Sequence, residues 1–532
     1  MERLGDRRLS RRTLLGAGAW GVGLAATTAL LQACGRTTAA TAPPGASTGS
    51  STGPTAAIGA GASAAPAPTV VPTSTVVPAT IAAPAVSKKF NGQTIKIATS
   101  TEYYAYAMRQ FRDQIEQSGN LKLSIDVVPG SDLYTRNQTE YNAGATSYDV
   151  TMFLPFQLPD YAPHMEPLKA LMDQGGLDLQ LDDVLPTFRD YYLTWGGTQV
   201  AMSFDGDIHL LFYNKEAFEN PDMVSQYKSK TGKDLAPPTT WDDYAAIAQF
   251  FTETPWRKDG QKGFGTAEGF SGPEWWWQNR FSAYGGIYFD QALKPLINGK
   301  NGLLATENLV KVADYAPPGS NNFGYQEAEN ALIKGDAAMS VNWSSAFRSA
   351  QDKSRSTTVG KIGAAVTPGA LVGGLALPSH PSLATGWVLG IPKYGKNKDA
   401  AAYVVWFLSQ PAVHARFCLD PATGIDAYRT SALKDPQFAA LYGQQYVDVI
   451  NQGLQSGFPD LQVPGANEYY TKLHDGLTQA ITKVKPVQAA LDGIAAEWDK
   501  VSARVGKDKQ QQAWGTALAA MNARGLTYKT LP

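Results

Sequence analysis

Hydrophobic positions from residue 95 onward follow two periods in turn, one of two residues and one of about 3.6 residues. Residues 95–98 alternate between apolar and polar side chains and predict a strand. Apolar residues at helical spacing over 104–115 predict the helix that follows. Residues 121–127 alternate again and predict a second strand. This part of the chain therefore begins as a strand–helix–strand unit.

A third strand is predicted at 148–153, after a helix that begins near Asp132 and runs to about Asn142. Strands and helices in this order are typical of a parallel sheet with helices on its faces. Ligands of such sheets bind beyond the carboxyl ends of the strands. Those ends are the loops 100–103 and 153–156, which are aromatic and polar and contain no glycine-rich phosphate motif.

More helices are predicted further along the chain. Thr240 and Asp243 form a capping box before an apolar helical run. Residues 399–410 predict a helix that Pro411 ends, and the tail after Ala466 has a helical period. The pattern as a whole favours an α/β fold with a helical C-terminal region.

The first 34 residues resemble an export signal that ends in a lipid attachment site. Residues 10–15 (SRRTLL) resemble a twin-arginine motif, and residues 31–34 (LQAC) resemble a lipobox after an uncharged, Gly- and Ala-rich run. We expect 1–34 to be a lipoprotein signal with lipidation at Cys34, which anchors the protein to the outer face of the cytoplasmic membrane, in the periplasm or at the cell surface. The alternative is an ordinary cleaved signal.

Residues 35–90 are expected to form a tether. The stretch 37–87 has no charged and no aromatic residue and is mostly Ala, Thr, Pro, Gly and Ser. Because such a stretch cannot bury enough apolar surface to offset the entropy of ordering, we expect it to be disordered. As a flexible coil, about 50 residues reach roughly 40 Å, enough for an anchored domain to turn freely.

Composition narrows the classes of function. The roughly 440 residues after the tether are more than a single hydrophobic core usually serves, so they indicate two domains. The net charge of −1 gives no electrostatic signature for nucleic acid, so no such partner is expected. The chain has 12 Trp, 24 Tyr and two Cys. If Cys34 is lipidated, Cys418 has no intramolecular disulfide partner.

Six segments stand in an order and spacing typical of one known family. They are 148–150, 205–215, 238–244, 278–286, 341–344 and 386–392. Through them the chain resembles the family 1 extracellular solute-binding proteins of ABC transporters, the sugar-binding group related to maltose-binding protein. The resemblance covers essentially all of residues 91–530.

The resemblance implies a two-lobed periplasmic-binding-protein fold, class II-like, with the ligand in the inter-lobe cleft and closure about a hinge. The implied lobes are an N-lobe of 91–205 and 390–445 and a C-lobe of 206–389 and 446–532. The implied hinge-crossing segments lie near 204–210, near 386–392 and between about 441 and 467.

A sugar presents hydroxyl groups and flat C–H faces, so aromatic rings and carboxylates in one cleft suit it. The resemblance places Trp275 and Trp343 at positions that stack on sugar, and Trp387 at the start of the second crossing. Asp205 and Asp207 lie on the first crossing, where side chains can point into the cleft. The alternatives are core packing for the tryptophans and a turn for the aspartates.

Other residues are expected to contact the ligand for less specific reasons. They are Thr101, Glu102, Tyr103, Phe156, His209, Glu274 and Arg429. His209 is expected to bond a hydroxyl group, since no neighbouring spacing indicates a metal, and a structural ion pair is the alternative for Arg429. No metal or cofactor is expected.

The expected function is that of a lipid-anchored, monomeric binding protein that captures a carbohydrate and delivers it to an ABC permease without catalysis. A polyol or another non-sugar solute is the first alternative. A tethered carbohydrate-active hydrolase is the second, although no nucleophile elbow, zinc motif or phosphate loop is present. A surface sensor or adhesin is the third.

Overall fold

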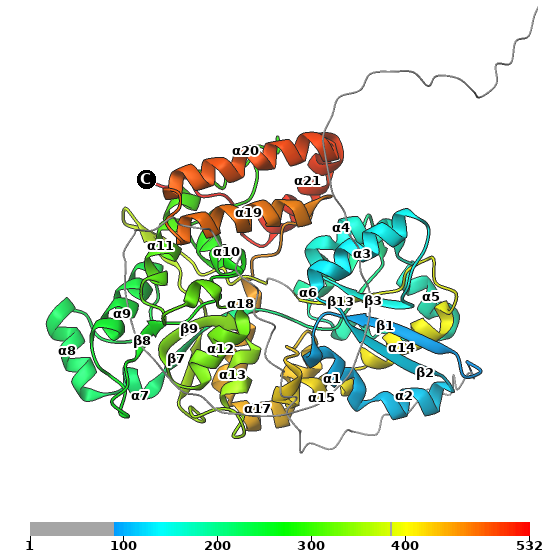
Figure 1. The fold of residues 1–532 in the computed structure, drawn as a ribbon, viewed down its shortest axis with the longest axis horizontal. Helices are drawn as coiled ribbons and strands as arrows, with labels where there is room; N and C mark the ends of the chain where they lie inside the picture. Colours follow the sequence, from blue (N-terminus) through cyan, green and yellow to red (C-terminus); the bar gives the residue numbers. More distant parts are fainter. Residues whose placement is uncertain (1–89, 384–385) are drawn as a thin grey trace, which may run out of the picture. The chain divides into compact units, whose positions relative to one another are not determined.

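The computed structural model describes residues 90–383 and 386–532, which fold around two β-sheets (Figure 1). The expected signal with Cys34, and the expected tether up to residue 89, lie outside the described residues. No helix among the described residues has both the length and the hydrophobicity that a membrane span needs.

The first sheet has the strand order β2-β1-β3-β13-β6. Its strands are β1 (Thr94–Thr99), β2 (Lys122–Val127), β3 (Val150–Phe153), β6 (Met202–Ser203) and β13 (Val388–Gly390). β1 runs parallel to β2 and β3, which confirms the three predicted strands, whereas β13 is antiparallel to both β3 and β6.

The helices between these strands begin at different residues from those the period indicates. The predicted helix over 104–115 is two helices, α1 (Glu102–Gln110) and α2 (Arg112–Gly119), which meet at Phe111. The next helix, α3 (Gly130–Asn142), begins two residues before Asp132, and its N-cap is a proline without a side-chain bond. The expected start at Asp132 is therefore wrong, because a polar residue of the first turn resembles a cap.

The second sheet has the strand order β10-β7-β9-β8. Its strands are β7 (His209–Asn214), β8 (Phe264–Thr266), β9 (Ala337–Trp343) and β10 (Ile362–Ala365). β7 is antiparallel to both β9 and β10, and β8 is parallel to β9. β9 is buried along its whole length, which fits a central strand covered on both faces.

The remaining elements cover the sheets or extend from them. The helices are α4 (Leu158–Tyr161), α5 (Leu168–Gly175), α6 (Pro186–Tyr192), α7 (Lys215–Phe218), α8 (Pro221–Thr231), α9 (Trp241–Glu253), α10 (Pro273–Ala283), α11 (Lys300–Ala313), α12 (Tyr325–Ile333), α13 (Ser345–Ala350), α14 (Lys398–Leu408), α15 (Pro411–Leu419), α16 (Thr430–Leu433), α17 (Pro436–Tyr442), α18 (Gln444–Gln455), α19 (Ala466–Ile481), α20 (Val487–Val505) and α21 (Lys507–Ala523). Two small hairpins add β4 (Thr194–Trp195) with β5 (Thr198–Gln199), and β11 (Ala370–Val372) with β12 (Leu375–Leu377).

The predicted caps and the helical tail are largely confirmed. Thr240 caps α9 by accepting from the Asp243 amide, but the side chain of Asp243 accepts from the Thr240 hydroxyl rather than from its amide. α14 ends at Leu408, and Pro411 occupies the first turn of α15, where its missing N–H has no cost. α19, α20 and α21 form the helical C-terminal region (Figure 1).

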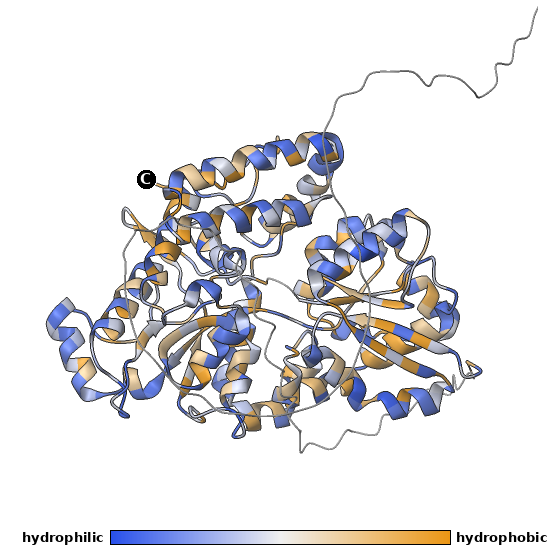
Figure 2. Cartoon of the chain, viewed as in Figure 1, coloured by the Kyte–Doolittle hydropathy of each residue, from blue (hydrophilic) through white to orange (hydrophobic). Residues whose placement is uncertain are grey.

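Hydropathy follows burial in both parts of the fold. α14 and the central strands are among the most hydrophobic elements, whereas α2 and α8 are mostly hydrophilic (Figure 2). One core cluster packs around the first sheet with α14 and α15, and another joins the second sheet to α9, α10, α11 and the C-terminal helices.

Segments that connect the two sheets lie side by side. The chain leaves the first sheet at β6 and enters the second at β7, so residues 204–208 connect them. The Phe204 amide donates to the Trp387 carbonyl at 2.8 Å, and the His209 amide donates to the Ser382 carbonyl at 2.9 Å. The Leu383 amide donates to the Phe458 carbonyl at 3.0 Å, which adds a third segment to this narrow junction.

A buried ion pair ties α10 to the second sheet. Arg280 donates to both carboxylate oxygens of Glu268, at 2.9 and 3.0 Å, and neither side chain is exposed. The guanidinium also donates to Asn308 at 2.8 Å and lies 4.1 Å from the ring centre of Trp241. Since every group is paired, removing one partner leaves an uncompensated buried charge.

We expect Glu268→Gln to lower the free energy of unfolding by about 3 kcal/mol or more, because it leaves the Arg280 guanidinium buried without its counter-charge. Urea denaturation measures the change. Glu253→Gln is the matched control, since it removes the exposed pair with Lys230. Equal effects of the two substitutions would contradict this account of the buried pair.

Candidate functional site

A cavity of about 240 Å³ lies where elements of the two sheets meet. It is lined by Thr101, Tyr103, Tyr104, Leu154, Asp207, Trp275, Tyr325, Trp343, Ser345, Trp387 and Gly424. The first three follow the carboxyl end of β1, and Leu154 follows that of β3. These are the loops at which a parallel sheet is expected to bind a ligand.

Aromatic rings form most of the cavity wall. The rings of Tyr103 and Tyr325 meet edge to face with centres 6.4 Å apart, and Tyr325 meets Trp343 in the same way at 5.6 Å. The ring centre of Tyr104 lies 6.1 Å from that of Trp387. Tyr103 belongs to α1, beside the first sheet, and Tyr325 begins α12, which packs on β9. The cavity is therefore closed by contacts between the two halves of the fold.

Three carboxylates gather at one side of this cavity. Carboxylate oxygens of Asp205, Asp207 and Asp426 lie within 4.8 Å of one another, and all three residues are buried. Asp207 lines the cavity, whereas Asp205 accepts from the Tyr104 hydroxyl at 2.6 Å and from the Asp426 amide at 2.6 Å. Asp426 pairs with the guanidinium of Arg348 at 3.2 Å. Of these three carboxylates, that of Asp207 is therefore the one that lines the cavity.

Burial and mutual repulsion change the ionisation of these groups. Burial, followed by the charge of Asp426, raises the pKa of Asp205 to about 7, although the bonds that it accepts act in the opposite direction. Burial also raises the pKa of Asp426, against the attraction of Arg348. Ionisation of Asp205 and of Asp426 therefore costs free energy at this site.

Gly206 allows the crossing segment to approach the loop that carries Asp426. A Cβ atom at this position would lie 2.6 Å from the carbonyl carbon and oxygen of Ala427. The Gly206 amide instead donates to the Asp426 carbonyl at 3.2 Å. Glycine at this position thus permits the close approach of the two backbone segments.

The structure brings together six of the twelve residues predicted to contact the ligand. These are Thr101, Tyr103, Asp207, Trp275, Trp343 and Trp387. Of the three consecutive tryptophans, Trp275 lines the cavity. Trp276 and Trp277 are buried, and their indole N–H groups donate to Val341 and Thr306.

Three of the remaining predicted residues lie close to the cavity without lining it. Phe156 packs against Trp275 with ring centres 5.8 Å apart and supports that ring from behind. Asp205 bonds protein groups, as described above. Glu102 forms an exposed ion pair with Arg109 at 2.9 Å.

The last three predicted residues make contacts within the protein. His209 bonds Asn279 through Nδ1 at 2.7 Å, and burial lowers its pKa to about 3, so it is neutral. Glu274 bonds His474 at 3.0 Å. Arg429 donates to main-chain carbonyls, including that of Ser409 at 2.9 Å, and lies 3.4 Å from Asp183, as in the ion-pair alternative.

Five lining residues have no signal in the sequence that singles them out. They are Tyr104, Leu154, Tyr325, Ser345 and Gly424. Tyr104 falls on the apolar stripe of a helix and is expected there as a core residue. Tyr325 begins a helix far along the chain, and only the packing of α12 on β9 brings it to α1.

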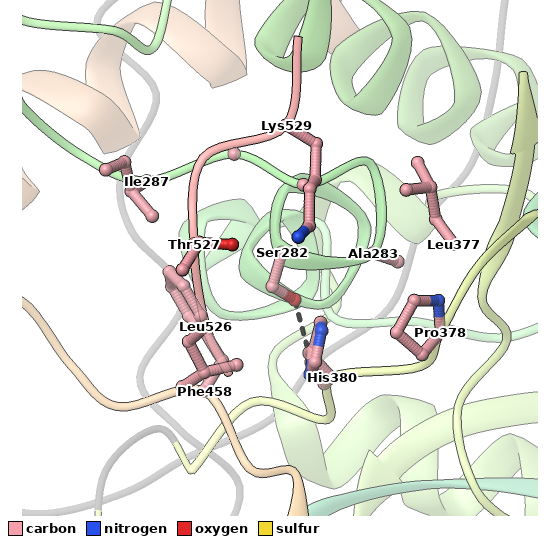
Figure 3. A pocket seen from close by; sticks show the side chains of 12 residues that line it. Ser282, Ala283, Ile287, Leu377, Pro378, His380, Phe458, Leu526, Thr527 and Lys529 are labelled. Carbon is pink, nitrogen blue, oxygen red and sulfur yellow. Dashed lines mark hydrogen bonds between the residues drawn. The ribbon is translucent and has the colours of Figure 1, made fainter. Parts of the chain in front are cut away.

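A second cavity, near the C-terminus, is too small to hold a solute. Its volume is about 10 Å³, and its lining includes Ser282, His380 and Lys529 (Figure 3). The Ser282 hydroxyl donates to the His380 carbonyl at 2.7 Å, so this hydroxyl has a partner within the protein. A space of this size holds about one water molecule.

The raised pKa of Asp205 predicts a pH dependence of stability. In the folded chain this pKa is about 7, whereas an unfolded aspartate titrates near about 3.9. The folded state thus binds more protons between these values, so the contribution of Asp205 to stability is present below about pH 4 and is lost as the pH rises through about 7. In Asp205→Asn the free energy of unfolding is expected to fall less between about pH 4 and about pH 7 than in the parent. Urea unfolding at several pH values across this range measures that free energy.

Asp173→Asn is the control for this profile, because the carboxylate of Asp173 is 62% exposed in a surface pair with Lys169. The free energy of unfolding of Asp173→Asn is expected to change with pH as that of the parent does across the same range. Parallel profiles for Asp205→Asn and the parent would contradict the raised pKa.

Comparison with known proteins agrees with this geometry. The family model described as bacterial extracellular solute-binding protein matches residues 97–413. A probable amino-acid ABC transporter periplasmic-binding protein of Sinorhizobium fredii is 27% identical over 419 residues, which are 77% of this chain and 90% of that protein. The mannitol-binding protein of Pseudomonas aeruginosa is 25% identical over 329 residues, which are 60% of this chain and 69% of that protein.

A solved structure shares the fold. It is an ABC transporter solute-binding protein of Agrobacterium radiobacter in complex with ribitol, with a TM-score of 0.66 and 21% identity, covering 78% of this chain and 100% of that one. This similarity confirms the two-lobed α/β fold, and the family match confirms the resemblance seen in the sequence. The chain belongs to the family of bacterial extracellular solute-binding proteins.

Proposed function

We propose that this protein captures one small hydroxylated solute, a monosaccharide or a polyol, in the cavity around Asp207 and delivers it to an ABC permease. The observation that carries the proposal is the convergence of six aromatic rings and a carboxylate on one cavity, from segments beside the first sheet and segments beside the second. Ring faces suit the C–H surfaces of such a solute, and the carboxylate and hydroxyl groups suit its hydroxyls.

The origin of the lining residues supports a mechanism of capture by closure. A solute in this cavity touches Thr101 and Tyr103 of one lobe and Trp275 and Trp343 of the other. It therefore makes more contacts when the lobes are together than when they are apart, and binding favours the closed form by that difference. Permease recognition then depends on closure and needs no chemical step.

The cavity volume favours a single sugar unit over an oligosaccharide. About 240 Å³ is below the roughly 300–1,000 Å³ of sites for drug-sized ligands. Two of the similar proteins bind small polyols, since one is a mannitol-binding protein and the other was solved with ribitol. The Sinorhizobium fredii protein is a probable amino-acid transporter component, so an amino acid is the competing solute class.

The arrangement of the aspartates supports binding rather than hydrolysis. The two carboxylates of a retaining glycosidase stand about 5–5.5 Å apart on opposite sides of the scissile bond. Oxygens of Asp205 and Asp207 lie within 4.8 Å, and Asp205 is engaged by Tyr104 rather than turned to the cavity. The engagement of Asp205 by Tyr104 thus supports a role in binding without catalysis.

The proposal includes the anchoring and the lobe boundaries. Twin-arginine export and lipidation of Cys34 would hold a monomer at the outer face of the cytoplasmic membrane, beside its permease. The proposed lobes are those implied by the sequence, with one adjustment. The boundary at which the chain returns from the C-lobe to the N-lobe is placed before Val388 instead of after residue 389. The reason is that β13, which begins at Val388, pairs with β3 in the first sheet.

We expect Trp275→Leu to weaken solute binding about 10-fold or more, because it removes a ring face from the cavity wall. Tryptophan fluorescence titrated with D-mannitol, ribitol, D-glucose, maltose and amino acids measures the affinity. Trp195→Leu is the matched control, since Trp195 is also half-buried but lies on the β4–β5 hairpin and does not line the cavity.

Saturable binding of one monosaccharide or polyol, weakened by Trp275→Leu and unchanged by Trp195→Leu, is the expected result. Binding of amino acids alone would overturn the proposed solute class. Equal effects of the two substitutions would place the site elsewhere.

A further inference from the structure

We propose that Tyr470 and Gln278 are positioning residues for solute capture. They join Trp275 in the cavity wall to the segments that connect the two sheets, so that the wall and these segments move together when the lobes close. The inference rests on the proposed function, because it names the residues through which capture by closure acts. Neither residue belongs to the cavity lining.

The ring of Tyr470 packs against a ring of the cavity wall and against a ring that follows a strand of the first sheet. Its centre lies 4.9 Å from that of Trp275 and 4.6 Å from that of Phe156. Trp275 belongs to α10, which packs beside α19 (Figure 1), whereas Phe156 follows β3. Tyr470 is therefore in contact with both sides of the fold, and a displacement of Trp275 reaches it directly.

The hydroxyl group of Tyr470 bonds a segment at the junction of the two sheets. It accepts from the Leu461 amide at 2.9 Å and from the Gln278 side chain at 2.6 Å, and it donates to the Asp460 carboxylate at 3.3 Å. Asp460 and Leu461 belong to residues 458–461, which lie beside the chain connections between the sheets. One hydroxyl group thus holds this segment to α10.

Gln278 extends the link to a second segment. Its Oε1 atom accepts from the Ser382 hydroxyl at 2.7 Å, while its Nε2 atom donates to the hydroxyls of Tyr470 and Tyr288, at 2.6 and 2.9 Å. Ser382 begins the stretch that leads into β13 of the first sheet. Gln278 lies about one turn after Trp275 on α10 and is fully buried, so water cannot replace these partners and each lost bond is costly.

The neighbouring residue Asn279 joins the same helix to the remaining connection. Its Oδ1 atom accepts from the Ser382 amide at 2.8 Å, and its Nδ2 atom bonds Nδ1 of His209 at 2.7 Å. His209 follows the connection 204–208, and its ring centre lies 4.5 Å from that of Trp343 in the cavity wall. α10 therefore carries one ring of the wall, is linked to a second, and bonds all three segments of the junction.

Hydrogen bonds make this link directional, which ring packing alone does not. Their strength falls steeply with distance and angle. Closure about a hinge changes the backbone of a few connecting residues. A shift of the segments at Ser382 and Leu461 must therefore either carry α10 and Trp275 with it or break buried bonds. Networks of this kind are physical routes of coupling between sites, and measured coupling is their test.

Tyr470→Phe keeps the ring and removes the hydroxyl group. Hydrogen exchange of the full chain without solute, resolved to single amides, is expected to be about 10-fold or more faster at Leu383 in this variant. The Leu383 amide donates to the Phe458 carbonyl, not to Tyr470, so a purely local loss would leave its exchange unchanged.

Tyr469→Phe is the matched control. Tyr469 precedes Tyr470 on α19 and is also buried, but its hydroxyl bonds Ser502 and Gln510 of the C-terminal helices, at 2.7 and 3.0 Å. Its exchange at Leu383 is expected to stay within about 2-fold of the parent. Unchanged exchange at Leu383 in Tyr470→Phe, or an equal rise in both variants, would overturn the inference.

Binding of D-mannitol and ribitol, followed by tryptophan fluorescence and stopped flow, tests the link to capture. Tyr470→Phe is expected to weaken binding about 5-fold or more through a faster dissociation rate, with the association rate within about 2-fold. Ser382→Ala interrupts the same link at its other end and is expected to act in the same way. Ser340→Ala is its control, since this buried hydroxyl donates to the Ala267 carbonyl at 2.6 Å beside the second sheet.

The double variant of Tyr470 and Ser382 is expected to bind no more weakly than the weaker of the single variants, because both changes interrupt one chain of bonds. Additive losses, or affinities equal to those of the controls, would overturn the inference and leave the proposed function standing. If no solute of the fluorescence panel bound the parent, the proposed function would fail, and exchange at Leu383 would still decide whether the two residues couple the junction segments.

Discussion

The site depends on one buried carboxylate that holds three segments of the chain together. Asp205 accepts from the Tyr104 hydroxyl of α1, from its neighbour Gly206 and from the Asp426 amide. Each bond uses a donor that is far from water and would be costly to leave unpaired. With these segments tied, Asp207 reaches the cavity from the crossing segment. Burial of the Asp205 carboxylate disfavours its ionised form and raises its pKa to about 7.

The aromatic wall is supported by a layer of packing that does not itself meet a solute. Trp275 packs against Tyr470, with ring centres 4.9 Å apart and ring planes inclined at 38°, and against Phe156. Trp343 is held by His209, whose ring centre is 4.5 Å away and whose lowered pKa keeps it uncharged. Several residues expected to bind the ligand thus orient the rings that line the cavity.

Strands were the most predictable elements, because burial on a sheet imposes a period of two that the sequence must carry. The strands at 94–99, 122–127 and 150–153 lie where alternation or apolar runs indicate them. Helix ends were less predictable. Phe111 divides one predicted helix into two, and α3 begins at Gly130 instead of Asp132, since a break or a cap depends on local geometry as well as residue type.

By itself, the sequence determined the α/β class, the family and the loops where a solute would bind, because periods, caps and ordered motifs are local properties. Only the tertiary structure decided that Trp275 lines the cavity while Trp276 and Trp277 are buried, and that Asp207 faces it while Asp205 does not. It alone brought Tyr325 to Tyr103, more than two hundred residues earlier in the chain. Those choices depend on which long-range neighbours fill the space around each side chain, and no local pattern encodes them.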